Sequence, residues 1–156
     1  MEEIKKKYNE IASKKGLPSW DELDKEYELG YMSPLSEISF PLRFIRRRIN
    51  DRFAWAANFF QGLLHPNSSS LISMQESKYF TAEDRNKISS LLREFMQIER
   101  LALTLDIDHN DENTINWIKD SHKKWMLHKK DLSFFAEKMR AGWTEETKSS
   151  GGAYFG

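Results

Sequence analysis

A chain of 156 residues, of which 39% are hydrophobic, is long enough to bury a core as a single domain. Its 24 Lys and Arg residues equal its 24 Asp and Glu residues, and this zero net charge argues against a dedicated, strongly basic nucleic-acid binder. The absence of cysteine excludes disulfides, Cys-based zinc sites and a Cys nucleophile. Because the sequence contains neither a secretory signal nor an apolar run of about 18 residues, we expect a cytoplasmic protein with no membrane span.

The first predicted elements are two helices joined by a short break. Apolar residues at helical spacing predict a helix over 2–15, which a glycine and a proline then end. Ser19 and Glu22 have the spacing of a capping box, so a short helix is predicted over 19–29. Residues 30–40 contain glycine, proline and several serines and are predicted to form a connection.

The segment 41–64 is predicted to be a long helix in the middle of the fold. At about 100° per residue, its apolar side chains form two neighbouring stripes that together cover more than half of the helix circumference. The first stripe is Leu42, Ile45, Ile49, Phe53, Ala56, Phe60 and Leu63, and the second is Phe44, Trp55 and Phe59. A helix that is apolar over so much of its surface packs on several sides, so it is expected at the centre of a bundle.

The remaining helices are predicted in the second half of the chain. Residues 71–80 are ambiguous and have the pattern of a short helical turn, whereas a start signal at Thr81 predicts a long helix over 81–105. A helix over 111–128 follows. Asp131 is the predicted N-cap of a last helix that ends near residue 141.

These elements predict an all-α fold, a five- or six-helix bundle around the central helix 41–64. Residues 1–143 are expected to form a single helical domain. Residues 144–156 are rich in polar residues and glycine and are expected to form a flexible tail.

Four polar side chains are predicted to point toward the core from apolar helix faces. They are Arg48, Arg52, Glu99 and His122. A buried guanidinium without a partner costs several kcal/mol, so each arginine must be paired or must face a wet cleft. One interpretation is an internal salt-bridge network, in which Glu22 or Glu26 supplies a carboxylate, and another is partial exposure of long side chains. The third is a small anionic-ligand site in which the two arginines clamp a carboxylate or phosphate.

No motif in the sequence predicts a catalytic residue, a metal site or a cofactor. Residues 106–110 resemble the start of a calcium-binding loop, but the positions that require Gly and Glu hold Asp111 and Trp117. His122 and His128 are six residues apart and do not share a helix face as a metal-ligand pair would. We therefore expect a non-enzymatic protein. The alternative is a catalytic cleft in which Glu99 or His122 is the acid–base group and the two arginines bind an anion.

Two groups of basic residues are candidates for RNA or ribonucleoprotein association. They are Arg43, Arg46 and Arg47, predicted at or near the exposed side of the central helix, and Lys119, Lys123 and Lys124. A few positioned cations are enough for sequence-independent phosphate contact. An ordinary solvated helix face explains the same residues, and the zero net charge favours that interpretation.

The leading functional hypothesis is a protein-binding or adaptor module with a protein partner or a second copy of the chain. Trp117 points away from the apolar stripe of its helix, and exposed tryptophan is typical of interfaces. Alternatively, Trp117 packs under a neighbouring segment. Tyr154 and Phe155 lie on a Gly- and Ser-rich tether and have the composition of a docking peptide or of an inert end.

The run GLPSWDELDKEYEL at residues 16–29, followed by LRFIRRRI at residues 42–49, resembles small helical proteins encoded in archaeal genomes. The resemblance implies an intracellular helical protein. It carries no known activity, so it implies no functional residues.

Overall fold

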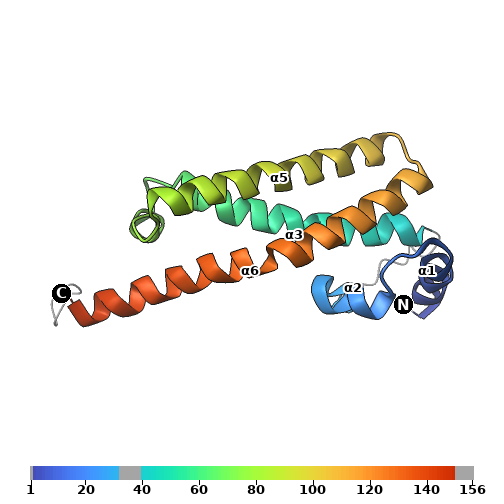
Figure 1. Cartoon of the computed structure of the whole chain (residues 1–156), viewed down its shortest axis with the longest axis horizontal. Coiled ribbons are helices and arrows are strands. Elements are labelled where there is room, and N and C mark those ends of the chain that lie inside the picture. Colours follow the sequence, from blue (N-terminus) through green and yellow to red (C-terminus); the bar gives the residue numbers. More distant parts are fainter. Residues whose placement is uncertain (1, 32–39, 150–156) are drawn as a thin grey trace.

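The computed structural model describes residues 2–31 and 40–149. Within these ranges the chain forms six α-helices, one 3-10 turn and no strand, which confirms the all-α fold (Figure 1). The helices are α1 (Glu2–Lys15), α2 (Trp20–Tyr27), α3 (Pro41–Leu64), α4 (Leu71–Ser77), α5 (Ala82–Ile107) and α6 (Asp111–Ser149), and the 3-10 turn is η1 (Leu29–Tyr31). No helix in these ranges is both long and apolar enough to cross a membrane.

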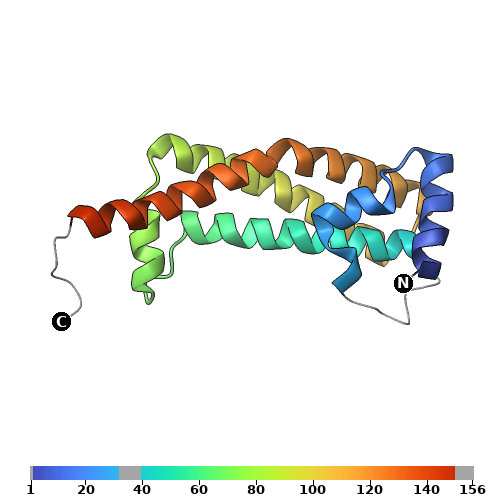
Figure 2. The same ribbon diagram turned by 90° about the horizontal axis from the view of Figure 1, so that it is seen from below.

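Helix α3 is central, as its apolar stripes predict, and every other α-helix contacts it. It runs antiparallel to α5, because Arg46 near its start bonds to Asp106 near the end of α5. It runs parallel to α6, because Phe53 packs against Trp125 and Phe60, farther along, packs against Phe135 of α6. Figures 1 and 2 show these three long helices lying lengthwise, with α1 and α2 at one end and α4 at the other.

Buried aromatic rings join the three long helices. Phe53 of α3 meets Phe95 of α5 edge-on at a centroid distance of 5.0 Å, and it meets Trp125 of α6 at 5.6 Å. Phe60, two turns farther along α3, contacts Phe95 and Phe135. Aromatic pairs of this kind contribute about 0.5–1.5 kcal/mol each beyond the area they bury, so the rings hold the helices in one register.

Helices α1 and α2 pack over the beginning of α3. The predicted capping box at Ser19 and Glu22 is formed, with the Glu22 carboxylate accepting the Ser19 N–H at 2.7 Å. Trp20, the first residue of α2, stacks on Phe44 of α3 at a centroid distance of 5.8 Å. Figure 2 shows α2, a helix of eight residues, lying between the long helices α3 and α6.

The predicted division of residues 111–141 into two helices is wrong. The helices expected over 111–128 and after Asp131 are one continuous helix, because Asp131 accepts a hydrogen bond from Lys87 of α5 at 2.6 Å instead of capping a new helix. Residues 144–149 continue α6, so this helix extends past the end expected near residue 141, and a flexible tail over 144–156 stays a prediction. The indole of Trp143 donates to Glu76 of α4 at 2.9 Å, and this contact supports the extended end of α6.

Candidate functional site

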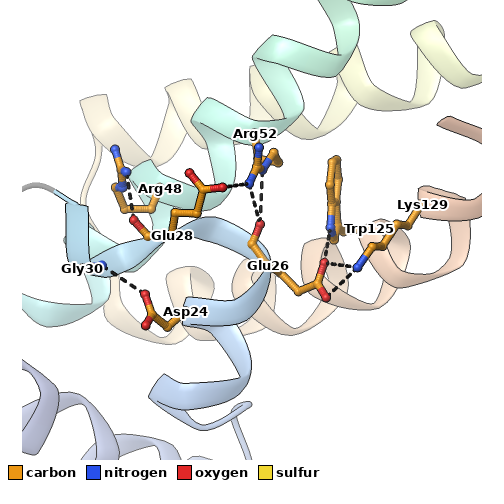
Figure 3. Close-up of polar contacts among 8 residues, drawn as sticks. All are labelled: Asp24, Glu26, Glu28, Gly30, Arg48, Arg52, Trp125 and Lys129. Atoms are coloured by element: carbon orange, nitrogen blue, oxygen red, sulfur yellow. Dashed lines mark hydrogen bonds and ion pairs between the residues drawn. The ribbon is translucent and has the colours of Figure 1, made fainter. Parts of the chain in front are cut away.

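Arg48 and Arg52 of α3 bind the carboxyl end of α2 (Figure 3). Arg52 donates from Nε and Nη2 to the carbonyl oxygen of Glu26 at 3.2 and 3.0 Å, and Arg48 donates to the carbonyl oxygen of Glu28 at 3.3 Å. The last carbonyls of a helix lack intrahelical partners and lie at the negative end of its dipole. The two guanidiniums therefore cap α2.

The backbone after α2 turns sharply at Glu28, which has a left-handed φ of 52°. Its N–H donates to the carbonyl oxygen of Asp24 at 2.9 Å, and the N–H of Gly30 donates to the Asp24 carboxylate at 3.0 Å (Figure 3). The Glu28 carboxylate also accepts from Arg52 at 3.3 Å. This turn presents the carbonyl groups that Arg48 and Arg52 bind.

Glu26 connects α2 to α6 through its side chain. Its carboxylate accepts the indole N–H of Trp125 at 3.1 Å and the ammonium of Lys129 at 2.8 Å (Figure 3). Burial raises the pKa of Glu26, but the hydrogen bonds from Lys129 and Trp125 outweigh it and hold that pKa below its ordinary value. The sequence signal for this role is weak. It consists only of the position of Glu26, three residues after the inward-facing Leu23 and so near the buried side of α2.

His122 and Glu99, the other two polar residues predicted to point toward the core, do not interact with Arg48 or Arg52. Nδ1 of His122 is hydrogen-bonded to the Tyr27 hydroxyl at 3.1 Å, and burial lowers the pKa of His122. Burial raises the pKa of Glu99, and the Glu99 carboxylate makes no hydrogen bond or ion pair to the described residues. No hydrogen bond or ion pair joins any two of the four predicted residues, because helices α3, α5 and α6 direct them toward different neighbours.

A small cavity of about 180 Å³ lies beside the two arginines. Its lining is Tyr27, Glu28, Arg48, Asp51, Arg52 and Trp55. Asp51 lies 3.4 Å from Arg48, and Glu28 lies 3.3 Å from Arg52, so each guanidinium already faces a carboxylate. An anion entering this cavity would compete with both carboxylates and with the carbonyls of α2.

Arg46, predicted to lie at or near an exposed basic face, is buried with 1% of its surface accessible. It donates to the carbonyl oxygen of Ala102 at 3.1 Å and forms an ion pair with Asp106. Burial lowers the pKa of Arg46, and the charge of Asp106 opposes that shift. The prediction is wrong because the last turns of α5 cover this part of α3, so Arg46 is not available to RNA.

The other five predicted RNA-binding residues lie on two different helices. Arg47 is 3.8 Å from Asp106, and Lys124 is 3.3 Å from Glu94. The guanidinium of Arg43 lies over the ring of Phe40, 5.2 Å from its centroid. Lys119 and Lys123 form no ion pair with the described residues. RNA association through these residues stays a prediction.

Trp117 is buried, with 3% of its surface accessible, so the alternative of packing under a neighbouring segment is correct. Its Nε1 donates to the carbonyl oxygen of Ile98 of α5 at 3.1 Å. Tyr154 and Phe155, the other residues predicted to contact a protein partner, lie outside the described residues.

Above Trp117, helices α5 and α6 form a groove of about 660 Å³ that the sequence did not predict. Ile98, Leu105 and Trp117 are buried and lie at its base. Leu101 lines the same groove with 53% of its surface accessible, and Asp108 and Asp120 are charged side chains at its exposed edges. The groove thus combines an apolar base, one half-exposed apolar side chain and a polar rim.

No protein-family model, curated protein or solved structure matches this chain. The resemblance to small archaeal helical proteins therefore stays a prediction. In the part of the chain that the structure describes, no group of three or more His, Asp or Glu residues is arranged to hold a metal ion.

Proposed function

We propose that this chain is a non-enzymatic helical binding module that holds a segment of a partner protein in the α5–α6 groove. The observation that carries the proposal is the position of Leu101, a half-exposed apolar side chain above the buried apolar base of the groove. Apolar side chains enclosed by a polar rim are typical of protein interfaces. The hydrogen bond from Trp117 to Ile98 fixes the base before a partner arrives, and such preorganisation lowers the entropy cost of binding.

The polar residues at the end of α2 indirectly support placing the binding site in the α5–α6 groove. Arg48 and Arg52 donate hydrogen bonds to backbone carbonyls at the end of α2, and Glu26 accepts hydrogen bonds from α6, so these residues act in holding the fold together. In the groove, by contrast, Asp108 and Asp120 form no ion pair with the described residues. The groove therefore has polar groups available for a partner.

The proposal is tested with a matched pair of variants on α5. Leu101 and Leu103 are 53% and 52% exposed, but only Leu101 lines the groove. Peptides of unconstrained sequence are selected from a displayed random library on the wild-type protein, and their affinities are measured by fluorescence anisotropy. We expect Leu101→Glu to weaken the strongest binders by about tenfold or more, because it places a charge over the apolar base.

The Leu103→Glu variant is the control, and it should leave the affinity of these peptides unchanged. Circular dichroism of both variants checks that each remains folded. The proposal is wrong if the strongest binders are insensitive to Leu101→Glu, or if both variants weaken them equally.

A further inference from the structure

We infer that the occupant of the α5–α6 groove is a single amphipathic helix with an apolar stripe flanked by lysine or arginine residues. This inference rests on the proposed binding function and names the chemistry of the partner. The spacing of the groove residues, the way α2 is bound and the charge of the rim all lead to it.

The two walls of the groove are rows of residues at helical spacing. The row on α5 contains Gln97, Leu101 and Thr104 and continues to the C-cap residue Asp108, and the row on α6 contains Asn113, Asn116, Asp120 and Lys124. Each row advances by eleven residues from its first member to its last, which corresponds to about 16 Å along a helix axis. The groove is therefore a trough parallel to α5 and α6, and its length suits about three turns of a helix.

Helix α2 shows how this fold binds a short helix between two long ones. Its buried residues Trp20, Leu23 and Tyr27 are spaced at i, i+3 and i+7 and face α3 and α6. A charged residue at the edge of that stripe, Glu26, pairs with Lys129 of α6 at 2.8 Å. The same principles, an apolar stripe on the base and a charged pair at the rim, apply to a helix in the α5–α6 groove.

The rim charges determine the sign that the partner must carry. Asp108 and Asp120 form no ion pair with the described residues, whereas Lys124, the one cation of the lining, lies 3.3 Å from Glu94. The rim thus presents two carboxylates whose charge the described chain does not compensate. Lysine or arginine beside the apolar stripe complements this charge, and glutamate or aspartate there is repelled.

The test uses three synthetic peptides of about 14 residues, long enough to span the trough. All three carry the same leucines at i, i+3 and i+7. The first has lysine flanks, the second has glutamate flanks, and the third is the lysine peptide with a central proline that breaks the helix. Binding to the wild-type protein is measured by isothermal titration calorimetry at low and high salt, and circular dichroism follows helix formation in the peptide.

We expect the lysine peptide to bind as a helix, more weakly at high salt, and to lose most of its affinity for the Leu101→Glu variant. Asp108→Asn and Asp120→Asn should each weaken it by about two- to fivefold, as expected for partly exposed ion pairs. Glu83→Gln is the matched control, because Glu83 is an exposed acid at the other end of α5 and does not line the groove. That variant should leave the affinity unchanged.

The inference is overturned if the glutamate peptide binds as tightly as the lysine peptide, if the proline peptide binds equally well, or if the lysine peptide does not bind. It is also overturned if sedimentation shows a wild-type dimer that Leu101→Glu dissociates, because a second copy then occupies the groove. The random-library selection imposes neither helix nor charge. If that library yields peptides whose binding depends on Leu101, the proposed function is supported even when the inference of a cationic helix is overturned.

Discussion

The indole Nε1 of Trp117 donates a hydrogen bond to the carbonyl oxygen of Ile98, 3.1 Å away. This bond joins the first half of α6 to the middle of α5, and both residues lie at the base of the groove between them. A carbonyl oxygen inside a helix keeps a second lone pair, so Ile98 can accept the indole without giving up its place in α5. The contact between α5 and α6 therefore forms the base of the groove, and the same two helices form its walls.

Replacing Trp117 with phenylalanine should destabilise the protein by about 1–3 kcal/mol, because it removes this hydrogen bond and part of a buried ring. Urea denaturation measures the free energy of unfolding. Trp143→Phe is the control: this indole also donates a hydrogen bond, to Glu76, but it lies at an exposed position and its loss should cost less. An equal cost for both variants would contradict the role assigned to Trp117.

The buried Arg46 and its partner Asp106 should show strong coupling. Asp106→Asn leaves a buried guanidinium without its carboxylate, and we expect it to destabilise the protein by about 1–3 kcal/mol. Arg46→Met keeps an unbranched side chain and removes the charge, so adding Asp106→Asn to it should cost little more. A double-mutant cycle in urea measures the coupling. Additive costs would show that the two charges do not stabilise each other.

Arg52→Lys should loosen the attachment of α2 to α3. Lysine cannot place two N–H groups on the Glu26 carbonyl as the Arg52 fork does, so we expect a loss of about 0.5–1.5 kcal/mol. Hydrogen exchange of the α2 amides should become faster while exchange in α5 is unchanged. Arg47→Lys, at an exposed position of α3, is the control and should alter neither. Unchanged α2 exchange in Arg52→Lys would contradict the capping role.

Glu99 and Glu26 should affect the pH dependence of stability with opposite signs. Burial raises the pKa of Glu99 above its ordinary 4.5, so its contribution is complete below that value and is lost as the pH rises through the folded pKa. The pKa of Glu26 is lowered, because the Lys129 and Trp125 hydrogen bonds outweigh burial, so its contribution is present above 4.5 and is lost on acidification.

At pH 7, Glu99→Gln should therefore raise the melting temperature, and Glu26→Gln should lower it. As the pH falls, the effect of Glu99→Gln should shrink first, because the raised pKa lets the wild-type Glu99 carboxyl take up a proton above 4.5. The effect of Glu26→Gln should shrink only below 4.5, because the pKa of Glu26 is lowered. Thermal melts of the two variants and the wild type across this range measure the effects. A lower melting temperature for Glu99→Gln at pH 7 would show that the Glu99 carboxylate has a stabilising partner.

Two helical glycines should respond to alanine in opposite ways. A Cβ at Gly142 of α6 would clash with the ring of Tyr79, so Gly142→Ala should destabilise the protein by about 1–3 kcal/mol. A Cβ at Gly62 of α3 would meet nothing within 4 Å, so Gly62→Ala should stabilise the protein by about 0.5–1 kcal/mol. Thermal denaturation compares the two, and stabilisation by Gly142→Ala would show that Tyr79 does not pack against α6.

Local sequence patterns determined where most helices begin and that α3 is central. The capping residues Ser19 and Thr81 bond to backbone groups three positions away, so the signal and the structure lie within one turn of the chain. The position of α3 follows from apolar stripes within that single segment. The new helix expected to begin at Asp131 does not form. The partner of the Asp131 carboxylate, Lys87, is 44 positions away in the sequence, so no local pattern could identify it.

Tertiary packing alone decided which polar and aromatic side chains are available for function. Arg46 and Arg47 are neighbours in the sequence, but the last turns of α5 bury the first and leave the second exposed. Trp117 and Leu101 form one groove only because α5 and α6 lie side by side. A periodic sequence pattern indicates which side of a helix is apolar, but it does not indicate which other helix packs on that side. The burial of a side chain, its ion-pair partner and the position of a groove all depend on which helices pack together, and that packing is a property of the whole fold.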